Sequence, residues 1–360
     1  MADLSVNLHG IKLKNPIMPA SGPLVRNYQC MMKCAENGVA ALNTKTISEK
    51  PVEIPIPCMQ EISEGMFLNS ELWSEISAEE WMEKEFSKSS AAGIPRFVSI
   101  GYTAEEVERL APIVAPYADV IEISTHYMER DIEPVIRAIK AASKYDKPVY
   151  IKISTGITKI GWYVKRLVEE GADGFVAINS IGPCLNIDVE TGMPFIGSSK
   201  GYGWLSGKAI NPIALRHVYS IANSVKVPII GVGGISSGED VVAMMMAGAS
   251  AVQICTEAVT HGYSAYARII QEFHQWLDNH NYKNASDIIG ITKEKIISRE
   301  LNTKPIIPRV DATKCTACGE CMKSCVYEAI TIESKCKINN ELCFGCGLCV
   351  TRCPEKAIKL

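Results

Sequence analysis

The sequence predicts an α/β protein, a TIM (β/α)8 barrel followed by a small C-terminal α+β domain. Eight short apolar runs alternate with amphipathic helical stretches, and these runs are continuous, which is typical of a parallel sheet covered by helices. No Gly-x-Gly-x-x-Gly follows the first run, so a doubly wound sheet is the weaker alternative. Regularly spaced cysteines near the end of the chain mark the small domain.

The barrel strands are expected at the apolar runs Pro16–Ala20, Ala40–Thr44, Phe97–Gly101, Asp119–Ser124, Val149–Ser154, Gly174–Asn179, Pro228–Val232 and Ala251–Cys255. Helices with one apolar face are expected at Glu105–Val114, Asp131–Ser143, Lys159–Glu170, Pro212–Asn223, Ser237–Ala247 and Ser264–Asn279. Thr103, with Glu106 three residues later, has the pattern of a helix-starting capping box.

Two long connections, residues 46–94 and 180–208, follow the second and sixth predicted strands. Long connections in compact domains are usually functional, and in a barrel both lie at the C-terminal face, where active sites form. The predicted domains are a barrel over residues 1–290, a polar linker over 291–308 with Lys304-Pro305, and a cluster domain over 309–360.

Eight of the 14 cysteines form two runs with the spacing Cys-x-x-Cys-x-x-Cys-x-x-x-Cys: Cys315, Cys318, Cys321 and Cys325, then Cys343, Cys346, Cys349 and Cys353. This is the spacing of bacterial ferredoxins with two 4Fe–4S clusters, in which the fourth cysteine of each run binds the other cluster. Zinc sites usually combine two separated pairs, so duplicated runs favour iron–sulfur clusters. The expected partition is Cys315, Cys318, Cys321 and Cys353 on one cluster, with Cys343, Cys346, Cys349 and Cys325 on the other.

Composition argues against several other classes of protein. The net charge is −3 without a basic tract, so no nucleic acid is expected. No apolar run approaches the ~20 residues needed to span a bilayer, so no membrane is expected, and the N-terminus lacks the pattern of a signal peptide. The six other cysteines are scattered, as expected of reduced thiols in a cytoplasmic protein.

Two features of the barrel predict a flavin. Gly233-Gly234 ends the seventh strand and Cys255-Thr256 ends the eighth, where barrels commonly bind phosphate. A phosphate-bearing redox cofactor beside one-electron clusters indicates FMN. Lys45 and Lys152 lie in apolar strands, where a lysine needs a partner. Lys152 is interpreted as a cation beside the flavin ring, with an ion pair to Glu122 as the alternative.

These residues resemble a known family. The barrel is similar to the dihydroorotate and dihydropyrimidine dehydrogenases, and the whole chain resembles the flavin- and cluster-bearing part of dihydropyrimidine dehydrogenase. The resemblance is carried by Asn43-Thr44-Lys45-Thr46, Phe67-Leu68-Asn69, Ala177-Ile178-Asn179-Ser180, Leu205-Ser206-Gly207 and Gly233-Gly234-Ile235. It implies FMN bound by Ala20, Ser21, Lys45, Thr46, Lys152, Gly207, Gly233, Gly234, Cys255 and Thr256. It implies substrate contacts from Asn69, Ser124, Asn179 and Ser180.

The chain departs from this family after the fourth strand. The family has Asn-x-Ser-Cys-Pro there, or Ser for Cys, and the Cys or Ser exchanges a proton with the substrate carbon. This chain has Glu122-Ile123-Ser124-Thr125-His126-Tyr127. Thr125 therefore stands at the catalytic position, with Ser124 and Lys152 as further catalytic candidates and His126 or Tyr127 as alternative acids. Glu122 replaces an asparagine, and an ionised carboxylate only accepts hydrogen bonds. We expect it to pair with Lys45 or Lys152, or to bind a donor-rich or cationic substrate.

The sequence therefore predicts an oxidoreductase that interconverts C=C and CH–CH bonds, using FMN and two 4Fe–4S clusters that exchange electrons. The default small-molecule substrate is a pyrimidine: uracil or thymine and their dihydro forms, or dihydroorotate. Because no nicotinamide site is visible, an NAD(P)H-oxidising flavoprotein subunit or a ferredoxin is the expected electron partner, in a homo- or hetero-oligomer. Two alternatives stay open. One keeps the cofactors but reduces a non-pyrimidine conjugated or aromatic compound, and the other is an electron-transfer subunit without its own substrate.

Overall fold

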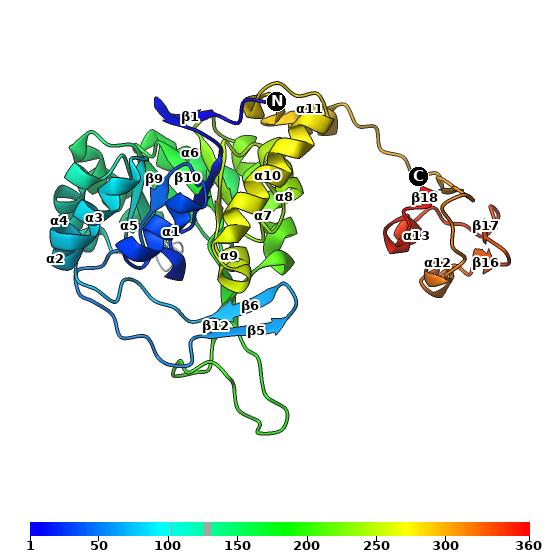
Figure 1. Ribbon diagram of the computed structural model, residues 1–360, viewed down its shortest axis with the longest axis horizontal. Coiled ribbons are helices and arrows are strands. Elements are labelled where there is room, and N and C mark those ends of the chain that lie inside the picture. The colour runs from blue at the N-terminus through cyan, green and yellow to red at the C-terminus, as the bar shows by residue number, and fades with distance from the viewer. Residues whose placement is uncertain (102, 126–130) are drawn as a thin grey trace. The chain divides into compact units, whose positions relative to one another are not determined.

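The computed structural model describes residues 1–101, 103–125 and 131–360. The chain separates into two compact units, Met1–Ile297 and Ser298–Leu360. The first unit contains an eight-stranded parallel sheet with the neighbour order β3-β14-β13-β10-β9-β8-β7-β4. A hydrogen bond of 2.9 Å from the Ala40 N–H to the Ile17 carbonyl joins β3 to the residues before β4, the two ends of this order, and so closes the sheet. The first unit is therefore a TIM barrel, as the sequence predicts (Figure 1).

The barrel strands coincide with the eight predicted apolar runs: β3 (Ile17–Pro19), β4 (Leu42–Asn43), β7 (Arg96–Ile100), β8 (Val120–Ser124), β9 (Val149–Ile153), β10 (Gly174–Ala177), β13 (Ile229–Val232) and β14 (Ala251–Ile254). From β7 to β14, every barrel-strand residue is buried. These strands are apolar throughout because helices cover one face and the barrel interior covers the other.

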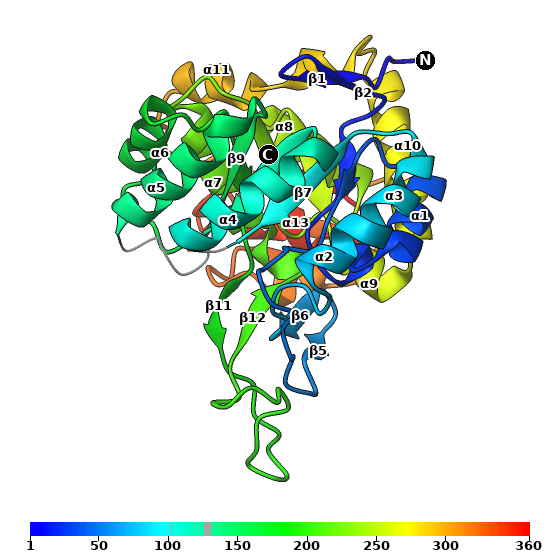
Figure 2. The same cartoon turned by 90° about the vertical axis from the view of Figure 1, so that its left-hand side faces the viewer.

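The helices around the barrel pack against one another in chain order (Figure 2). Six match predictions: α4 (Ala104–Val114), α5 (Ile132–Ala142), α6 (Ile160–Glu169), α7 (Asn211–Ala222), α8 (Gly238–Ala247) and α10 (Ser264–Asn279). Thr103 and Glu106 form the expected capping box at the start of α4. The sequence reading missed α1 (Tyr28–Glu36), α2 (Ala78–Glu80), α3 (Phe86–Ser89), α9 (Thr256–His261), α11 (Ile291–Ile297) and the hairpin of β1 (Val6–Leu8) and β2 (Ile11–Leu13).

The two long connections meet in a four-stranded antiparallel sheet with the order β11-β12-β6-β5. Its strands are β5 (Met59–Ser63), β6 (Met66–Asn69), β11 (Ile181–Cys184) and β12 (Gly203–Ser206). Trp204 pairs with Asn69 and Ser206 with Phe67, so the second and sixth strands' connections are fixed to each other. Figures 1 and 2 show this sheet at one end of the barrel.

The second unit contains β15 (Arg309–Val310), α12 (Glu320–Lys323), β16 (Ile330–Ile332), β17 (Cys336–Ile338), α13 (Leu348–Arg352) and β18 (Ile358–Lys359). Antiparallel pairs join β15 to β18 and β16 to β17. Residues 298–308, all of which the structure describes, contain no helix or strand. Among the described residues, no helix combines the length and apolar character needed to cross a membrane.

Candidate active site and cluster sites

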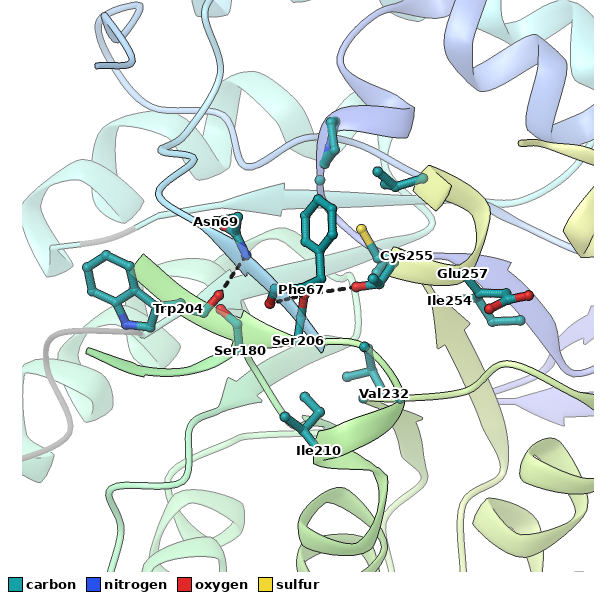
Figure 3. A pocket seen from close by; sticks show the side chains of 18 of the residues that line it. Phe67, Asn69, Ser180, Trp204, Ser206, Ile210, Val232, Ile254, Cys255 and Glu257 are labelled. Atoms are coloured by element: carbon teal, nitrogen blue, oxygen red, sulfur yellow. Dashed lines mark hydrogen bonds between the residues drawn. The ribbon is translucent and has the colours of Figure 1, made fainter. Parts of the chain in front are cut away.

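A cavity of about 1150 Å³ opens at the carboxyl ends of the barrel strands. Its wall combines residues that end the barrel strands with residues from β6 and β12. Figure 3 shows Asn69, Ser180 and Trp204 toward one side of this cavity, with Cys255 and Glu257 toward the other. A hydrogen bond of 3.2 Å from Asn69 Nδ2 to the Trp204 carbonyl orients the amide. The antiparallel sheet β11-β12-β6-β5, which we call the extension sheet, thus completes a pocket that the barrel alone would leave open.

Most of the sequence-predicted site residues lie on this wall. It includes all ten residues expected to bind FMN: Ala20, Ser21, Lys45, Thr46, Lys152, Gly207, Gly233, Gly234, Cys255 and Thr256. It also includes four of the expected substrate contacts: Asn69, Ser124, Asn179 and Ser180. Glu122 and Thr125 are fully buried and lie outside the lining. His126 and Tyr127 lie outside the described residues.

Glu122 lies within the barrel, behind the pocket wall. Its Oε2 accepts hydrogen bonds from Asn43 Nδ2 at 3.0 Å and from Gln253 Nε2 at 2.8 Å. Its Oε1 is 3.6 Å from Lys152 Nζ and 3.5 Å from Ser99 Oγ. Both carboxylate oxygens thus have partners within the barrel. Glu122 therefore holds Lys152 in place and does not face the cavity.

Thr125 also differs from the expectation. Its Oγ1 donates a hydrogen bond of 2.9 Å to the Lys152 carbonyl and is fully buried. The hydroxyl therefore ties the end of β8 to β9, away from the pocket. Ser124, one residue earlier, lines the pocket instead. Because successive side chains of a strand point to opposite faces, only one of these two hydroxyls can face the cavity.

Lys45 has two acidic partners that the sequence reading missed. Its Nζ lies 2.9 Å from Glu75 Oε1 and 3.3 Å from Glu71 Oε1. Glu71 lines the pocket two residues after Asn69. Burial raises the pKa of Glu71 above its ordinary value, and Lys45 opposes this shift. The sequence feature that could have indicated these partners of Lys45 is the acidic pair Glu71-x-x-x-Glu75 beside Asn69.

In the second unit, the cysteines of the two runs line two small cavities. Cys315, Cys318, Cys321 and Cys353 line one, and Cys325, Cys343, Cys346 and Cys349 line the other. These are the two sets expected from the ferredoxin spacing. Cys336, one of the six cysteines outside the two runs, also lines the first cavity. Its Sγ is 3.7 Å from Cys321 Sγ, and its N–H donates to Cys315 Sγ at 3.4 Å.

Comparison with protein families agrees with this arrangement. The family described as dihydroorotate dehydrogenase matches residues 3–277. The chain belongs to the dihydroorotate dehydrogenase family. A 4Fe–4S dicluster domain matches residues 309–357. The chain is therefore an oxidoreductase of the class that acts on CH–CH groups, and it combines a flavin-binding barrel with an iron–sulfur domain.

Three relatives share the name dihydroorotate dehydrogenase B (NAD(+)), catalytic subunit. The protein of Pyrococcus abyssi is 32% identical over 310 residues, covering 80% of this chain and 98% of the relative. That of Geobacter metallireducens is 33% identical over 304 residues, covering 80% and 97%. That of Anoxybacillus flavithermus is 33% identical over 307 residues, covering 81% and 96%.

The phosphate end of the family's flavin fits the loop after β13. Gly233 and Gly234 have φ angles of +126° and +71°, which favour glycine. A Cβ on Gly234 would lie 2.7 Å from the Asn211 nitrogen, so only glycine fits where this loop packs against the start of α7. Asp240 fixes the next residues by accepting hydrogen bonds from the Ser236 N–H at 2.9 Å and the Ser237 N–H at 3.1 Å.

The ring end of a flavin fits the wall near β14. Gln253 Oε1 is buried without a hydrogen-bond partner among the described residues, although its Nε2 is bonded to Glu122. An unpaired buried acceptor is costly, and a ligand N–H would satisfy it. Burial raises the pKa of the Cys255 thiol to about 12, so this wall residue stays neutral. The unpaired acceptor and the neutral thiol therefore suit the ring of a flavin in this family member.

Proposed function

We propose that this chain is an FMN- and iron–sulfur-dependent oxidoreductase that interconverts a C=C and a CH–CH bond in a pyrimidine. One observation carries the proposal: the ten residues that the resemblance assigns to FMN and the four that it assigns to the substrate line one cavity of about 1150 Å³. The curated relatives, named dihydroorotate dehydrogenase B, support a substrate of pyrimidine type.

Bound FMN supplies hydride transfer together with one-electron exchange. The N–H groups of the Gly233-Gly234 loop, which lines the pocket, would hold its phosphate. Lys152 supplies a positive charge at the ring, and Glu122 fixes its ammonium group at 3.6 Å. A cation held in a poorly solvated site stabilises negative charge that develops there.

The substrate side is assigned to Asn69, Ser124, Asn179 and Ser180. Asn179 Oδ1 accepts a hydrogen bond of 2.9 Å from the Ser180 N–H. The amide nitrogen of Asn179 is the group that would donate hydrogen bonds to a substrate. Amide and hydroxyl groups suit the alternating donors and acceptors of a pyrimidine ring. We assign proton exchange at the substrate carbon to Ser124, since Thr125 is bonded to the Lys152 carbonyl.

The cluster domain is assigned two 4Fe–4S clusters that exchange electrons with FMN. The relatives are named catalytic subunits of NAD(+) enzymes, which indicates a second subunit. We therefore assign an NAD(P)H-oxidising flavoprotein subunit or a ferredoxin as the electron partner of this chain.

An anaerobic experiment tests the proposal. The cluster-intact protein is reduced with dithionite, and flavin absorbance is followed after addition of uracil, thymine or orotate. Reoxidation by a pyrimidine is the expected result. Reoxidation by artificial acceptors alone contradicts it, and then favours the second candidate, a reductase of a non-pyrimidine conjugated compound. That candidate rests on Glu71, a carboxylate that lines the pocket two residues after Asn69.

A further inference from the structure

We propose that the substrate end of this pocket selects an uncharged or cationic ring and rejects one that carries a carboxylate, and that Glu71 sets this preference. The inference rests on the proposed function, because it takes Asn69 and its neighbours as the substrate side. It narrows the substrate class within that function, toward compounds of the uracil type and away from orotate and dihydroorotate.

The first observation is the surplus of negative charge around Lys45. Its side chain is 2% exposed, and carboxylates of Glu71 and Glu75 lie 3.3 and 2.9 Å from its ammonium group. One positive charge thus faces two negative charges. Glu75 is 39% exposed and partly screened by water, whereas Glu71 is 13% exposed and lines the pocket. The charge that a ligand meets here is therefore that of a carboxylate.

The other lysines on the described part of the wall are also paired with carboxylates. Lys152 lies 3.6 Å from Glu122, and Lys208 lies 2.6 Å from Asp240. Arg26, which acts on Glu71 electrostatically, is exposed to solvent and bonded to the Pro23 carbonyl. Solvent screens the charge of such an exposed cation, so Arg26 compensates little of the charge on Glu71.

The position of Glu71 places this charge at the substrate. Asn69 ends β6 with its amide bonded to the Trp204 carbonyl, and Glu71 follows two residues later on the same wall. A carboxylate ligand entering beside Asn69 would give up its hydration without gaining an unpaired cation. An uncharged ring with N–H groups meets a favourable partner instead, because Glu71 offers acceptor oxygens to those donors.

Orotate and orotamide test the inference directly, since they share one ring and differ in carboxylate against carboxamide. Binding to the oxidised, full-length holoprotein is measured from the change in flavin absorbance. Orotamide is expected to bind at least tenfold more tightly than orotate. Glu71→Gln should narrow this ratio to less than threefold by strengthening orotate binding. Glu79→Gln removes an exposed carboxylate of the same connection outside the lining and should leave the ratio unchanged.

Two results would overturn the inference: equal or tighter binding of orotate by the wild type, or an equal effect of Glu71→Gln on both ligands. If neither ligand binds and no pyrimidine reoxidises the flavin, the proposed function fails, and sulfite binding still tests the effect of the negative charge of Glu71.

Sulfite is an anion that adds reversibly to oxidised flavins and bleaches their absorbance. Glu71→Gln should strengthen its binding at least fivefold, and an unchanged affinity would count against the role of Glu71.

Discussion

The ammonium group of Lys152 lies 3.6 Å from the carboxylate of Glu122, and the two side chains are 7% and 0% exposed. The residues come from adjacent strands, β9 and β8, whose register pairs Ser124 with Lys152. Asn43 and Gln253 complete the hydrogen bonds of the carboxylate. A buried ion pair of this kind holds its cation in place, and removing either partner leaves the other charge uncompensated.

Removal of Glu122 should therefore destabilise the barrel strongly. Glu122→Ala leaves Lys152 as an uncompensated buried charge, which costs about 3–5 kcal/mol of unfolding free energy. All five tryptophans lie in the first unit, so tryptophan fluorescence during denaturant unfolding reports on the barrel. Glu108→Ala removes a carboxylate from a solvent-exposed pair with Lys144 and should cost about 1 kcal/mol or less. Equal effects of the two substitutions would show that the buried pair is not structural.

The barrel was predictable because its strands are continuous apolar runs, a pattern that burial on both faces requires. The extension sheet was not, because β5 (Met59–Ser63) alternates between partly buried and exposed residues and its partners lie far away in the chain. Nothing in the local sequence indicates that Asn69 pairs with Trp204. Such pairing depends on where the barrel places the two connections.

The site shows the same division. The glycines after β13 and the lysines in the strands were predictable, because their residue types conflict with an ordinary apolar strand. The pairing of Lys45 with Glu71 joins residues 26 positions apart and requires the folded connection. Thr125 and Ser124 could be named as candidates from the sequence. Which of the two hydroxyls faces the pocket could not, because a shift of one residue at the end of β8 would exchange them.

Asp240 should stabilise the loop after β13 in a pH-dependent manner. Burial opposes its ionisation, but hydrogen bonds from Lys208 and Ser236 hold the pKa of Asp240 below its ordinary value of 3.8. A lowered pKa contributes stability that is present above 3.8 and is lost as the pH falls through the lower, folded value. Asp240→Asn should cost about 1–3 kcal/mol at about pH 7, and less at about pH 3, where the unfolded chain is largely protonated at this position. Denaturant unfolding at both pH values checks this, and a difference that grows on acidification would contradict it.

Ser124 and Thr125 should separate in their effects on rate and stability. Thr125→Ala removes a hydrogen bond to the Lys152 carbonyl and should lower stability by about 0.5–1.5 kcal/mol, with flavin reoxidation slowed less than about threefold. Ser124→Ala should slow proton-coupled reoxidation by about 100-fold with little change in stability. Anaerobic stopped-flow with the best pyrimidine acceptor gives the rates, and Thr125→Ser serves as the conservative control. A 100-fold loss in Thr125→Ala with full activity in Thr125→Ser would return the catalytic role to Thr125.

If the fourth cysteine of each run binds the cluster of the other run, its removal should change which thiols are protected from alkylation. Cys353 lines the cavity of Cys315, Cys318 and Cys321, so Cys353→Ala should expose those three thiols to alkylation and reduce bound iron by about four atoms per chain. Cys325→Ala should instead expose Cys343, Cys346 and Cys349. Mass spectrometry of alkylated peptides identifies the set that is released.

Cys336→Ala is the matched control for the first cavity, because Cys336 lines it without belonging to either run. It should keep both thiol sets protected and the iron content unchanged. Its N–H to Cys315 Sγ comes from the backbone, so the substitution leaves that hydrogen bond in place. If Cys353→Ala exposed Cys343, Cys346 and Cys349 instead, each run would bind its own cluster. The grouping of cysteines in the two cavities would then not correspond to ligation.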